Sequence, residues 1–264
     1  MTSFDNRQYW ESRLREHYSL AGVGYLRLGR RYNEWMYRVR GTVFDRVVAS
    51  LNPGGWAGRS VLDVGSGTGF YVERWLGLGA QVTGLDLTEV AVGELQRAFP
   101  AASFLQGDIG AAQAIPLAPA TFDAVSAMDV LFHIVDDAAY ARAFTNIATL
   151  LKPGGWFLWS DNFLRHATER VAHQASRSLA ESTRLVEAAG FEVVQRVPMF
   201  VLMNYPADTR SRLARWGWTA LMAPALVAEP LGWLLGAALY PLERALVTAK
   251  RESPSTELMV CRRR

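Results

Sequence analysis

The chain has 264 residues, half of them hydrophobic, and 28 Lys and Arg against 25 Asp and Glu give a net charge of +3. This composition excludes intrinsic disorder and a strongly basic nucleic-acid-binding domain. The single cysteine, Cys261, excludes a disulfide framework and a thiolate metal cluster. The first residues are polar and charged, so we expect no secretory signal and a cytoplasmic protein.

The net charge is unevenly distributed along the chain. Residues 1–50 carry a net +4, residues 51–200 a net −5 and residues 201–264 a net +4. The first fifty residues also hold nine of the thirty aromatic residues, and they are expected to form helices interrupted at glycines. An acidic middle therefore lies between two basic flanks.

The middle segment alternates short apolar runs with helical periodicity, which is typical of a parallel sheet covered by helices. We predict strands at Ser60–Gly65, Gln81–Asp86, Ser103–Gln106, Phe122–Met128, Trp156–Asp161 and Phe191–Val197. The helices expected between them lie at about Gly69–Leu78, Val90–Phe99, Asp137–Leu151 and Ser178–Ala189. This order predicts a doubly wound α/β fold, whose ligands bind beyond the carboxyl ends of the strands.

The segment from Trp216 to Leu242 contains Glu229 as its only charge and approaches the length of a membrane span, about twenty residues. Three prolines, at positions 224, 230 and 241, interrupt it and favour a buried or interfacial helical hairpin. The flanking basic residues suit an anionic membrane surface or an acidic amphiphilic substrate, or are ordinary solvated charges. A last apolar strand is expected at Glu257–Cys261.

The strongest local motif is VLDVGSGTG, from Val61 to Gly69, in which a buried-type strand runs into three alternate glycines and a helix. Glycines are needed where the backbone turns sharply and a ligand approaches closely, and the helix start offers unpaired N–H groups. The spacing differs from the dinucleotide-binding pattern because Phe70 occupies its third glycine position. An NAD-linked oxidoreductase is therefore disfavoured.

Carboxylates end the second and third predicted strands. Asp86 can accept hydrogen bonds from both hydroxyls of a ribose, and Asp108 can accept from an exocyclic amine while Ile109 packs on a purine face. Either acid alone is explained equally well as a solvated strand-end residue. Their placement at consecutive strand ends favours a nucleotide-binding site.

Together these motifs resemble those of the class I S-adenosylmethionine-dependent methyltransferases. The resemblance covers about Ser60–Val197 through VLDVGSGTG, GLDLT, QGDI, FDAVSAMDVLFHIVDD and LLKPGGWFLWSDN. It implies S-adenosylmethionine as cofactor without a metal, and a Rossmann-like, doubly wound, seven-stranded sheet whose last strand is antiparallel. Glu257–Cys261 would then pair beside Phe191–Val197.

The resemblance also implies the residues that contact the methyl donor. The glycines would lie against its methionine and ribose portion, Asp86 and Leu87 at the ribose and adenine, and Asp108 and Ile109 at the adenine. Asp63 would orient the loop, and Tyr9, in a YWE segment, would cap the cofactor. The expected donor-binding residues are Tyr9, Asp63, Gly65, Gly67, Gly69, Asp86, Leu87, Asp108, Ile109 and Met128.

Methyl transfer to a hydroxyl or ammonium group requires alignment and removal of a proton. His133 is a candidate base because a neutral imidazole is competent near pH 7, although a packing or loop-fixing role is the favoured alternative. Asp129 is a second candidate, with a helix or loop cap as the alternative. Metal-dependent transfer is disfavoured, because Asp161 and Asn162 alone do not make a ligand cluster.

We expect four segments: an aromatic helical lid (1–52), a donor-binding core (53–203), an apolar helical insert before the last strand (204–255) and that strand (256–264). The predicted activity is O-methylation of a hydroxyl or carboxylate on an apolar small molecule, such as a natural product or lipid-like precursor. Transfer to nitrogen, carbon or a glycan hydroxyl, and a donor-binding regulatory module without turnover, are the alternatives. Residues 216–242 would serve as a lid, a homodimer interface or a peripheral membrane contact, and no nucleic acid partner is expected.

Overall fold

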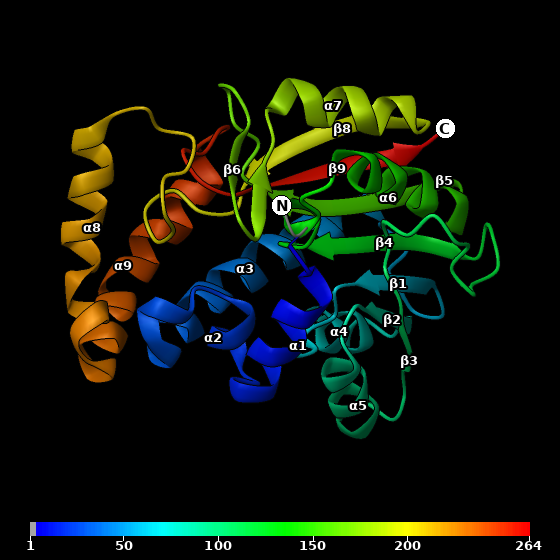
Figure 1. Cartoon of the computed structure of the whole chain (residues 1–264), viewed down its shortest axis with the longest axis horizontal. Coiled ribbons are helices and arrows are strands. Elements are labelled where there is room, and N and C mark those ends of the chain that lie inside the picture. Colours follow the sequence, from blue (N-terminus) through cyan, green and yellow to red (C-terminus); the bar gives the residue numbers. More distant parts are fainter. Residues whose placement is uncertain (1–3) are drawn as a thin grey trace.

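The computed structural model describes residues 4–264, so residues 1–3 of the predicted lid lie outside the described residues. One seven-stranded sheet forms the centre (Figure 1). Its strands are β1 (Ser60–Val64), β2 (Gln81–Asp86), β3 (Ser103–Gln106), β4 (Phe122–Met128), β5 (Leu151–Asp161), β8 (Phe191–Pro198) and β9 (Glu257–Arg263). They lie in the order β3-β2-β1-β4-β5-β9-β8.

The pairing of the strands confirms the expected topology. Strands β1 to β5 pair with one another in parallel. Strand β9 is antiparallel to both β5 and β8, with Trp159 opposite Met259 and Val193 opposite Cys261. The reversal of strand order between β1 and β4 leaves a crevice at their carboxyl ends, which is where ligands bind in such sheets.

Helices cover both faces of the sheet in the predicted alternation: α4 (Phe70–Gly77), α5 (Glu89–Ala98), α6 (Asp137–Leu150) and α7 (Leu179–Ala188). Three of them begin after a residue whose side chain accepts a hydrogen bond from the first turn: Thr88, Asp136 and Ser178. Such N-caps satisfy amide groups that the helix itself leaves unpaired. Because the N-cap residue marks where a helix begins, these three helices begin close to the positions predicted from the sequence.

The N-terminal flank divides into two parts with different packing. Helix α3 (Gly29–Leu51) is a core helix, and Val39, Val43 and Phe44 on it are fully buried. In contrast, α1 (Asn6–Glu16) buries only Leu14 fully, and a four-residue helix α2 (Leu20–Val23) joins it to α3 through a single 3-10 turn (Leu26–Leu28). Side chains of α1 reach the carboxyl ends of the strands, together with Val23 of α2 and Tyr37 of α3.

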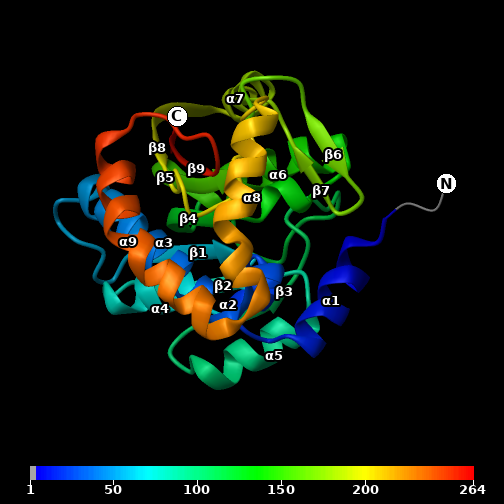
Figure 2. The same ribbon diagram turned by 90° about the vertical axis from the view of Figure 1, so that its left-hand side faces the viewer.

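The insert forms a helical hairpin of α8 (Arg212–Val227) and α9 (Glu229–Ala249), which lies against α3 and is seen face-on in Figure 2. The expected breaks at Pro224 and Pro241 are wrong, because both lie inside a helix. An internal proline removes one backbone hydrogen bond, and packing against α3 holds the helices together despite that loss. None of the helices within residues 4–264 combines the length and hydrophobicity that a bilayer crossing requires.

A small hairpin between β5 and α7 was not predicted. Its strands are β6 (Glu169–Val171) and β7 (Gln174–Ser176), and they pair only with each other. Three-residue polar strands lack the apolar alternation from which strands are recognised in a sequence. The hairpin places His173 next to the carboxyl end of β4, where the candidate site lies.

Candidate functional site

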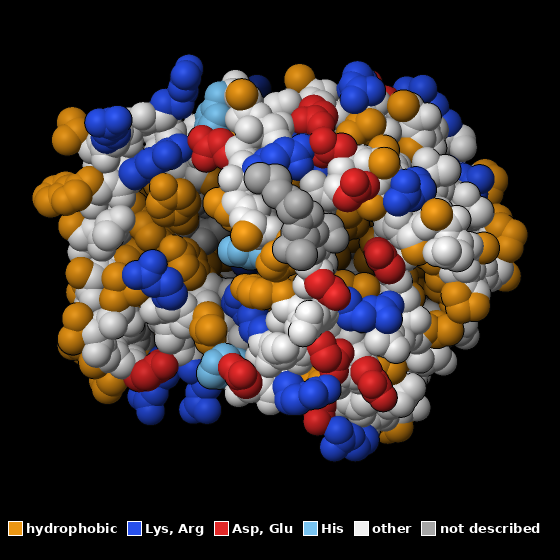
Figure 3. All heavy atoms as spheres, viewed as in Figure 1, with side chains coloured by type: hydrophobic (Ala, Val, Ile, Leu, Met, Phe, Trp, Pro, Cys, Tyr) orange, Lys and Arg blue, Asp and Glu red, His pale blue; other side chains and the backbone are white. Residues whose placement is uncertain are grey.

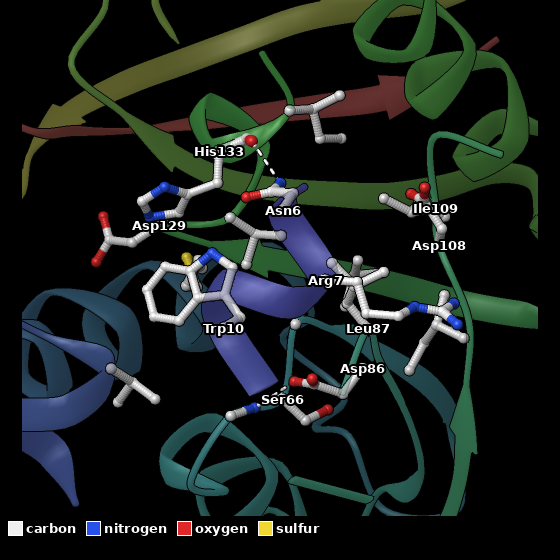
Figure 4. Close-up of a pocket in the computed structure, with 18 of the residues that line it drawn as sticks. Asn6, Arg7, Trp10, Ser66, Asp86, Leu87, Asp108, Ile109, Asp129 and His133 are labelled. Carbon is white, nitrogen blue, oxygen red and sulfur yellow. Dashed lines mark hydrogen bonds between the residues drawn. The ribbon is translucent and has the colours of Figure 1, made fainter. Parts of the chain in front are cut away.

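A cavity of about 490 Å³ opens at the carboxyl ends of β1, β2 and β4. Its walls come from the loop after β1, from the ends of β2, β3 and β4, and from α1. Figure 4 shows Asp129 and His133 on one side of it and Asp108 and Ile109 on the opposite side. Nine of the residues predicted to form the site line it: Gly65, Gly67, Asp86, Leu87, Asp108, Ile109, Met128, Asp129 and His133.

The glycine loop adopts a backbone that other residues rarely tolerate. Gly65, Gly67 and Gly69 all have positive φ, at 67°, 54° and 84°. A Cβ at Gly69 would lie 2.3 Å from the ring of Phe99. Gly69 does not line the cavity; it precedes α4 and lets that helix begin directly under the loop.

Asp86 joins the loop to β2. Its Oδ2 accepts a hydrogen bond from the Gly67 amide at 2.8 Å, and its Oδ1 accepts from the amide and hydroxyl of Thr88 at 2.9 and 2.8 Å. The side chain is almost fully buried, and this burial raises the pKa of Asp86. The carboxylate is thus held at the cavity wall beside Leu87.

Asp63 lies beneath the loop and does not line the cavity. Its Oδ1 accepts a hydrogen bond from the hydroxyl of Ser126 on β4 at 2.6 Å, and the Ser66 hydroxyl donates to its backbone carbonyl at 2.9 Å. Burial raises the pKa of Asp63 to about 7. This residue connects β1, β4 and the loop.

Helix α1 closes the cavity with residues outside the expected donor-binding set. Asn6, Trp10 and Leu14 line it, and their spacing of four places them on one helix face. The Asn6 amide donates to the His133 carbonyl at 2.5 Å, and the Trp10 ring meets the His133 ring edge-on at 4.7 Å. Of these three residues only Leu14 is buried, so the i, i+4 spacing by itself does not identify this face in the sequence.

Tyr9, the predicted cap, does not line the cavity. It stacks on His173 at 5.3 Å, and its hydroxyl accepts a hydrogen bond from Arg13 at 2.9 Å. Adjacent helix positions are about 100° apart, so Trp10 points into the cavity where Tyr9 cannot. Tyr9 therefore packs α1 against the β6–β7 hairpin.

Helix α1 is also anchored at the start of α5. The Glu11 carboxylate accepts hydrogen bonds from the amides of Glu89 and Val90, at 2.8 and 3.3 Å. A negative charge is stabilised at a helix N-terminus by the unpaired amides and the helix dipole. Further along, the Tyr18 hydroxyl donates to the Gly67 carbonyl at 3.1 Å, which ties the flank to the glycine loop.

His133 presents one ring nitrogen as a hydrogen-bond acceptor. Its Nδ1 lies 3.0 Å from the backbone carbonyl of His173. A carbonyl only accepts, so Nδ1 carries the proton and Nε2 keeps its lone pair. Burial lowers the pKa of His133 to about 3, and the imidazole is therefore neutral at physiological pH.

Asp129 is held by two partners. Its Oδ1 accepts from the Ser160 hydroxyl at 2.9 Å, and its Oδ2 forms an ion pair with Arg40 of α3 at 2.8 Å. The Arg40 side chain is 7% exposed, and its Nε and Nη1 have no partner within residues 4–264. The Asp129 carboxylate therefore secures α3 to the end of β4, and this geometry favours positioning over proton transfer.

Three polar atoms on residues of the cavity wall are buried and make no hydrogen bond within the described part of the chain: Asn6 Oδ1, Thr68 Oγ1 and the Tyr71 hydroxyl. Buried polar atoms are nearly always paired in folded proteins, so these await a ligand or water. Together with Asp86 and Asp108, they fit a ligand with ribose hydroxyls, an adenine amine and an amino-acid end. Within residues 4–264 there is no group of three His, Cys, Asp or Glu that would hold a metal.

Comparison with known proteins gives consistent results. A family model described as a methyltransferase domain matches residues 61–155. The ubiquinone biosynthesis O-methyltransferase of Albidiferax ferrireducens is 41% identical over 107 residues, which cover 39% of this chain and 41% of that protein. The enzyme of the same name from Thiobacillus denitrificans is 37% identical over 177 residues, covering 58% of this chain and 75% of that protein.

The chain therefore matches only about two fifths of the length of the first of these relatives. Among solved structures, magnesium protoporphyrin IX methyltransferase from Synechocystis PCC 6803, with bound S-adenosylmethionine, is similar over the full length of both chains. Its TM-score is 0.59 at 16% identity, a level at which the similarity shows the fold alone.

Proposed function

Because the chain belongs to the class I S-adenosylmethionine-dependent methyltransferases, whose cofactor is S-adenosylmethionine, we propose that it methylates an oxygen atom of an apolar small molecule. The observation that carries this proposal is the composition of one cavity. The nucleotide-type residues Asp86 and Asp108 share it with His133, a neutral imidazole that offers a lone pair. The two ends are thus suited to a donor and to a hydroxyl-bearing acceptor.

The donor-binding roles follow from the chemistry of the wall. Asp86 would accept from the ribose hydroxyls, and Asp108 from the adenine amine, with Ile109 against the ring. The Thr68 and Tyr71 hydroxyls, which have no partner in the described chain, would serve the amino-acid end. When bound, S-adenosylmethionine supplies a methyl group already activated by a sulfonium.

The acceptor end is lined by apolar side chains, which favours an acceptor with an apolar body. Trp10, Leu14, Val130 and Ile134 all contribute to the cavity wall. Their burial against a ligand removes apolar surface from water, which stabilises binding. The relatives are named O-methyltransferases, which supports oxygen over nitrogen or carbon as the acceptor atom.

His133 would hold the acceptor hydroxyl and receive its proton. A phenolic hydroxyl has a pKa of about 10, and the pKa of His133 is about 3. Complete proton transfer before the reaction would therefore be uphill by about 10 kcal/mol, at 1.36 kcal/mol per pKa unit. His133 consequently acts first as a hydrogen-bond acceptor. It takes the proton only as the oxygen forms its bond to the methyl group, because that bond makes the hydroxyl proton strongly acidic.

The test is a screen of hydroxyl-bearing aromatic and lipid-like compounds with isotopically labelled donor, read by mass spectrometry. We expect a product that has gained one labelled methyl group on oxygen. Labelled product on nitrogen or carbon alone would contradict the proposed acceptor atom. Donor binding with no product from any compound class would instead support a binding module without turnover.

The role of His133 is tested with His133→Gln, against His17→Gln as the matched control, since His17 is exposed on the outer end of α1 and does not line the cavity. We expect kcat to fall about a hundredfold in His133→Gln, as for loss of a general base, with unchanged donor affinity. The control should behave like the wild type. A wild-type rate in His133→Gln would exclude the role.

A further inference from the structure

The outer faces of α8 and α9 are apolar although no part of the described chain covers them. On α8, the side chains of Leu213, Trp216 and Val227 are 82%, 72% and 78% exposed. On α9, Leu234 and Leu242 are 57% and 51% exposed. Figure 3 shows hydrophobic side chains gathered on the side of the molecule that this hairpin forms.

These residues form a continuous stripe on each helix. On α8, residues 213, 216, 220, 223 and 227 are all exposed and recur every three or four positions. On α9, the exposed apolar residues 231, 234, 238, 242 and 245 do the same. Because such a spacing places side chains on one face, each helix presents an uninterrupted apolar surface outward.

The stability of the fold does not require these outward stripes. The opposite faces of the two helices already pack inward, where Met222 and Val247 are buried and Gly236 lies against Trp35. A surface helix normally carries polar residues on its outer face, and helices that are apolar on both faces are covered by another surface. The outer stripes therefore indicate a binding surface.

The charges around the stripes are mostly positive. The two acids of the hairpin are already engaged: Glu229 accepts from the amides of Arg30 and Arg31, and Glu243 is fully buried and accepts from Val201 and Leu202. Glu252, just past the hairpin, is exposed but pairs with Arg165 and Arg196. The exposed cations of the hairpin and its ends are Arg210, Arg212, Arg244, Lys250 and Arg251. A surface with apolar stripes and cations suits a partner that is apolar and anionic.

We propose that the α8–α9 hairpin docks the protein onto an anionic lipid bilayer, with both helices lying in the plane of the membrane. Neither helix is long and apolar enough to cross a bilayer, so the outer stripes enter only the interfacial region. The arginines and lysine then lie at the depth of the headgroups, where anionic lipids attract basic residues. This inference goes beyond the methyl-transfer proposal and does not depend on it.

The charge pattern favours a bilayer over a second copy of the chain. In a two-fold symmetric dimer the same patch meets itself, so two surfaces that both carry net positive charge would be brought together. Like charges brought together across an interface oppose association. An anionic bilayer instead neutralises every one of them.

The experiment is vesicle flotation of the full chain with pure phosphatidylcholine and with mixed phosphatidylcholine and phosphatidylglycerol. We expect binding to the mixed vesicles, weak binding to the neutral ones, and loss of binding at about 1 M salt, where the Debye length is about 3 Å. Leu213→Ser/Trp216→Ser should weaken binding about tenfold or more. The matched control, Val171→Ser/Val194→Ser, changes exposed valines on β6 and β8 and should bind normally.

Neutralising the arginines tests the electrostatic part. Arg212→Gln/Arg244→Gln should weaken binding to mixed vesicles about fivefold per arginine, and Arg184→Gln on α7 should leave it unchanged. Absence of flotation by the folded wild type, or equal binding to neutral vesicles, would overturn the proposal. So would a concentration-dependent dimer in sedimentation velocity that Leu213→Ser/Trp216→Ser dissolves while vesicles are not bound.

Discussion

Breaking the ion pair between Arg40 and Asp129 from one side should cost several kcal/mol of folding stability, and Asp129→Asn is the change that tests it. The substitution removes the charge but keeps an oxygen that can accept from the Ser160 hydroxyl. It also suits the backbone, because Asp129 has a φ of 58° and asparagine tolerates this left-handed region well. The variant therefore isolates the loss of the negative charge.

The expected magnitude follows from the burial of the pair. Its atoms are 2.8 Å apart, and the side chains of Arg40 and Asp129 are only 7% and 17% exposed. At an effective dielectric of about 20, the gross Coulomb attraction at that distance is about 6 kcal/mol. Removing one partner leaves the Arg40 charge buried and unpaired, which typically costs about 3–5 kcal/mol of unfolding free energy.

The assay is urea unfolding of wild type, Asp129→Asn, Arg40→Met and the double variant. We expect the double variant to lose clearly less stability than the sum of the two single variants, because it no longer buries an isolated charge. Asp45→Asn is the control, since Asp45 pairs with Arg74 and is 54% exposed, and it should change stability by about 1 kcal/mol or less. An Asp129→Asn protein as stable as the wild type, or additive effects, would refute the reasoning.

Three further changes test the loop, its support and the anchoring of α1. Gly69→Ala combines a φ of 84° with a Cβ 2.3 Å from Phe99 and should lower the unfolding free energy by about 2 kcal/mol or more in urea titrations; a neutral effect would contradict that geometry. The pKa of Asp63 is raised to about 7, so the folded protein keeps a proton that the unfolded chain has lost, and the unfolding free energy should fall as pH rises from about 4 to 7. Asp63→Asn should remove up to about 4 kcal/mol of this pH dependence. An identical pH profile in the variant would show that the pKa of the carboxyl is not perturbed. Glu11→Gln should weaken the contact between α1 and α5 by about 0.3–1 kcal/mol and speed amide hydrogen exchange in α1, while unchanged exchange would show that Glu11 does not hold the helix.

The sheet was predictable because its signals are local. Strands β2, β3 and β4 have the predicted bounds, and each is an apolar run followed by turn residues or a helix cap. Asp86 and Asp108 were placed at the cavity because a residue that ends a parallel strand lies at the ligand-binding edge. For residues at the end of a parallel strand, the position in the sequence therefore determines the position in the fold.

The face of α1 that lines the cavity and the role of Asp129 were not predictable in this way. Helix α1 buries Leu14 alone, so its weak apolar pattern does not show which face meets the cavity, and Tyr9 was expected to contact the donor where Trp10 lines the cavity. Asp129 was predicted as a candidate base, whereas in the structure it forms an ion pair with Arg40. Arg40 lies far away in the chain, and no local sequence pattern connects the two residues.

The measurement that tests the central claim most directly is calorimetric titration of S-adenosylmethionine into the wild type and Asp86→Ala, with Glu192→Ala on β8 as the control and thermal melts to verify folding. We expect saturable one-site binding to the wild type and to the control. Loss of two hydrogen bonds to a charged acceptor, about 1.5–3 kcal/mol each, should weaken binding to Asp86→Ala about a hundredfold or more. No binding to the wild type, or equal affinity in folded Asp86→Ala, would contradict the assignment of this cavity as the donor site.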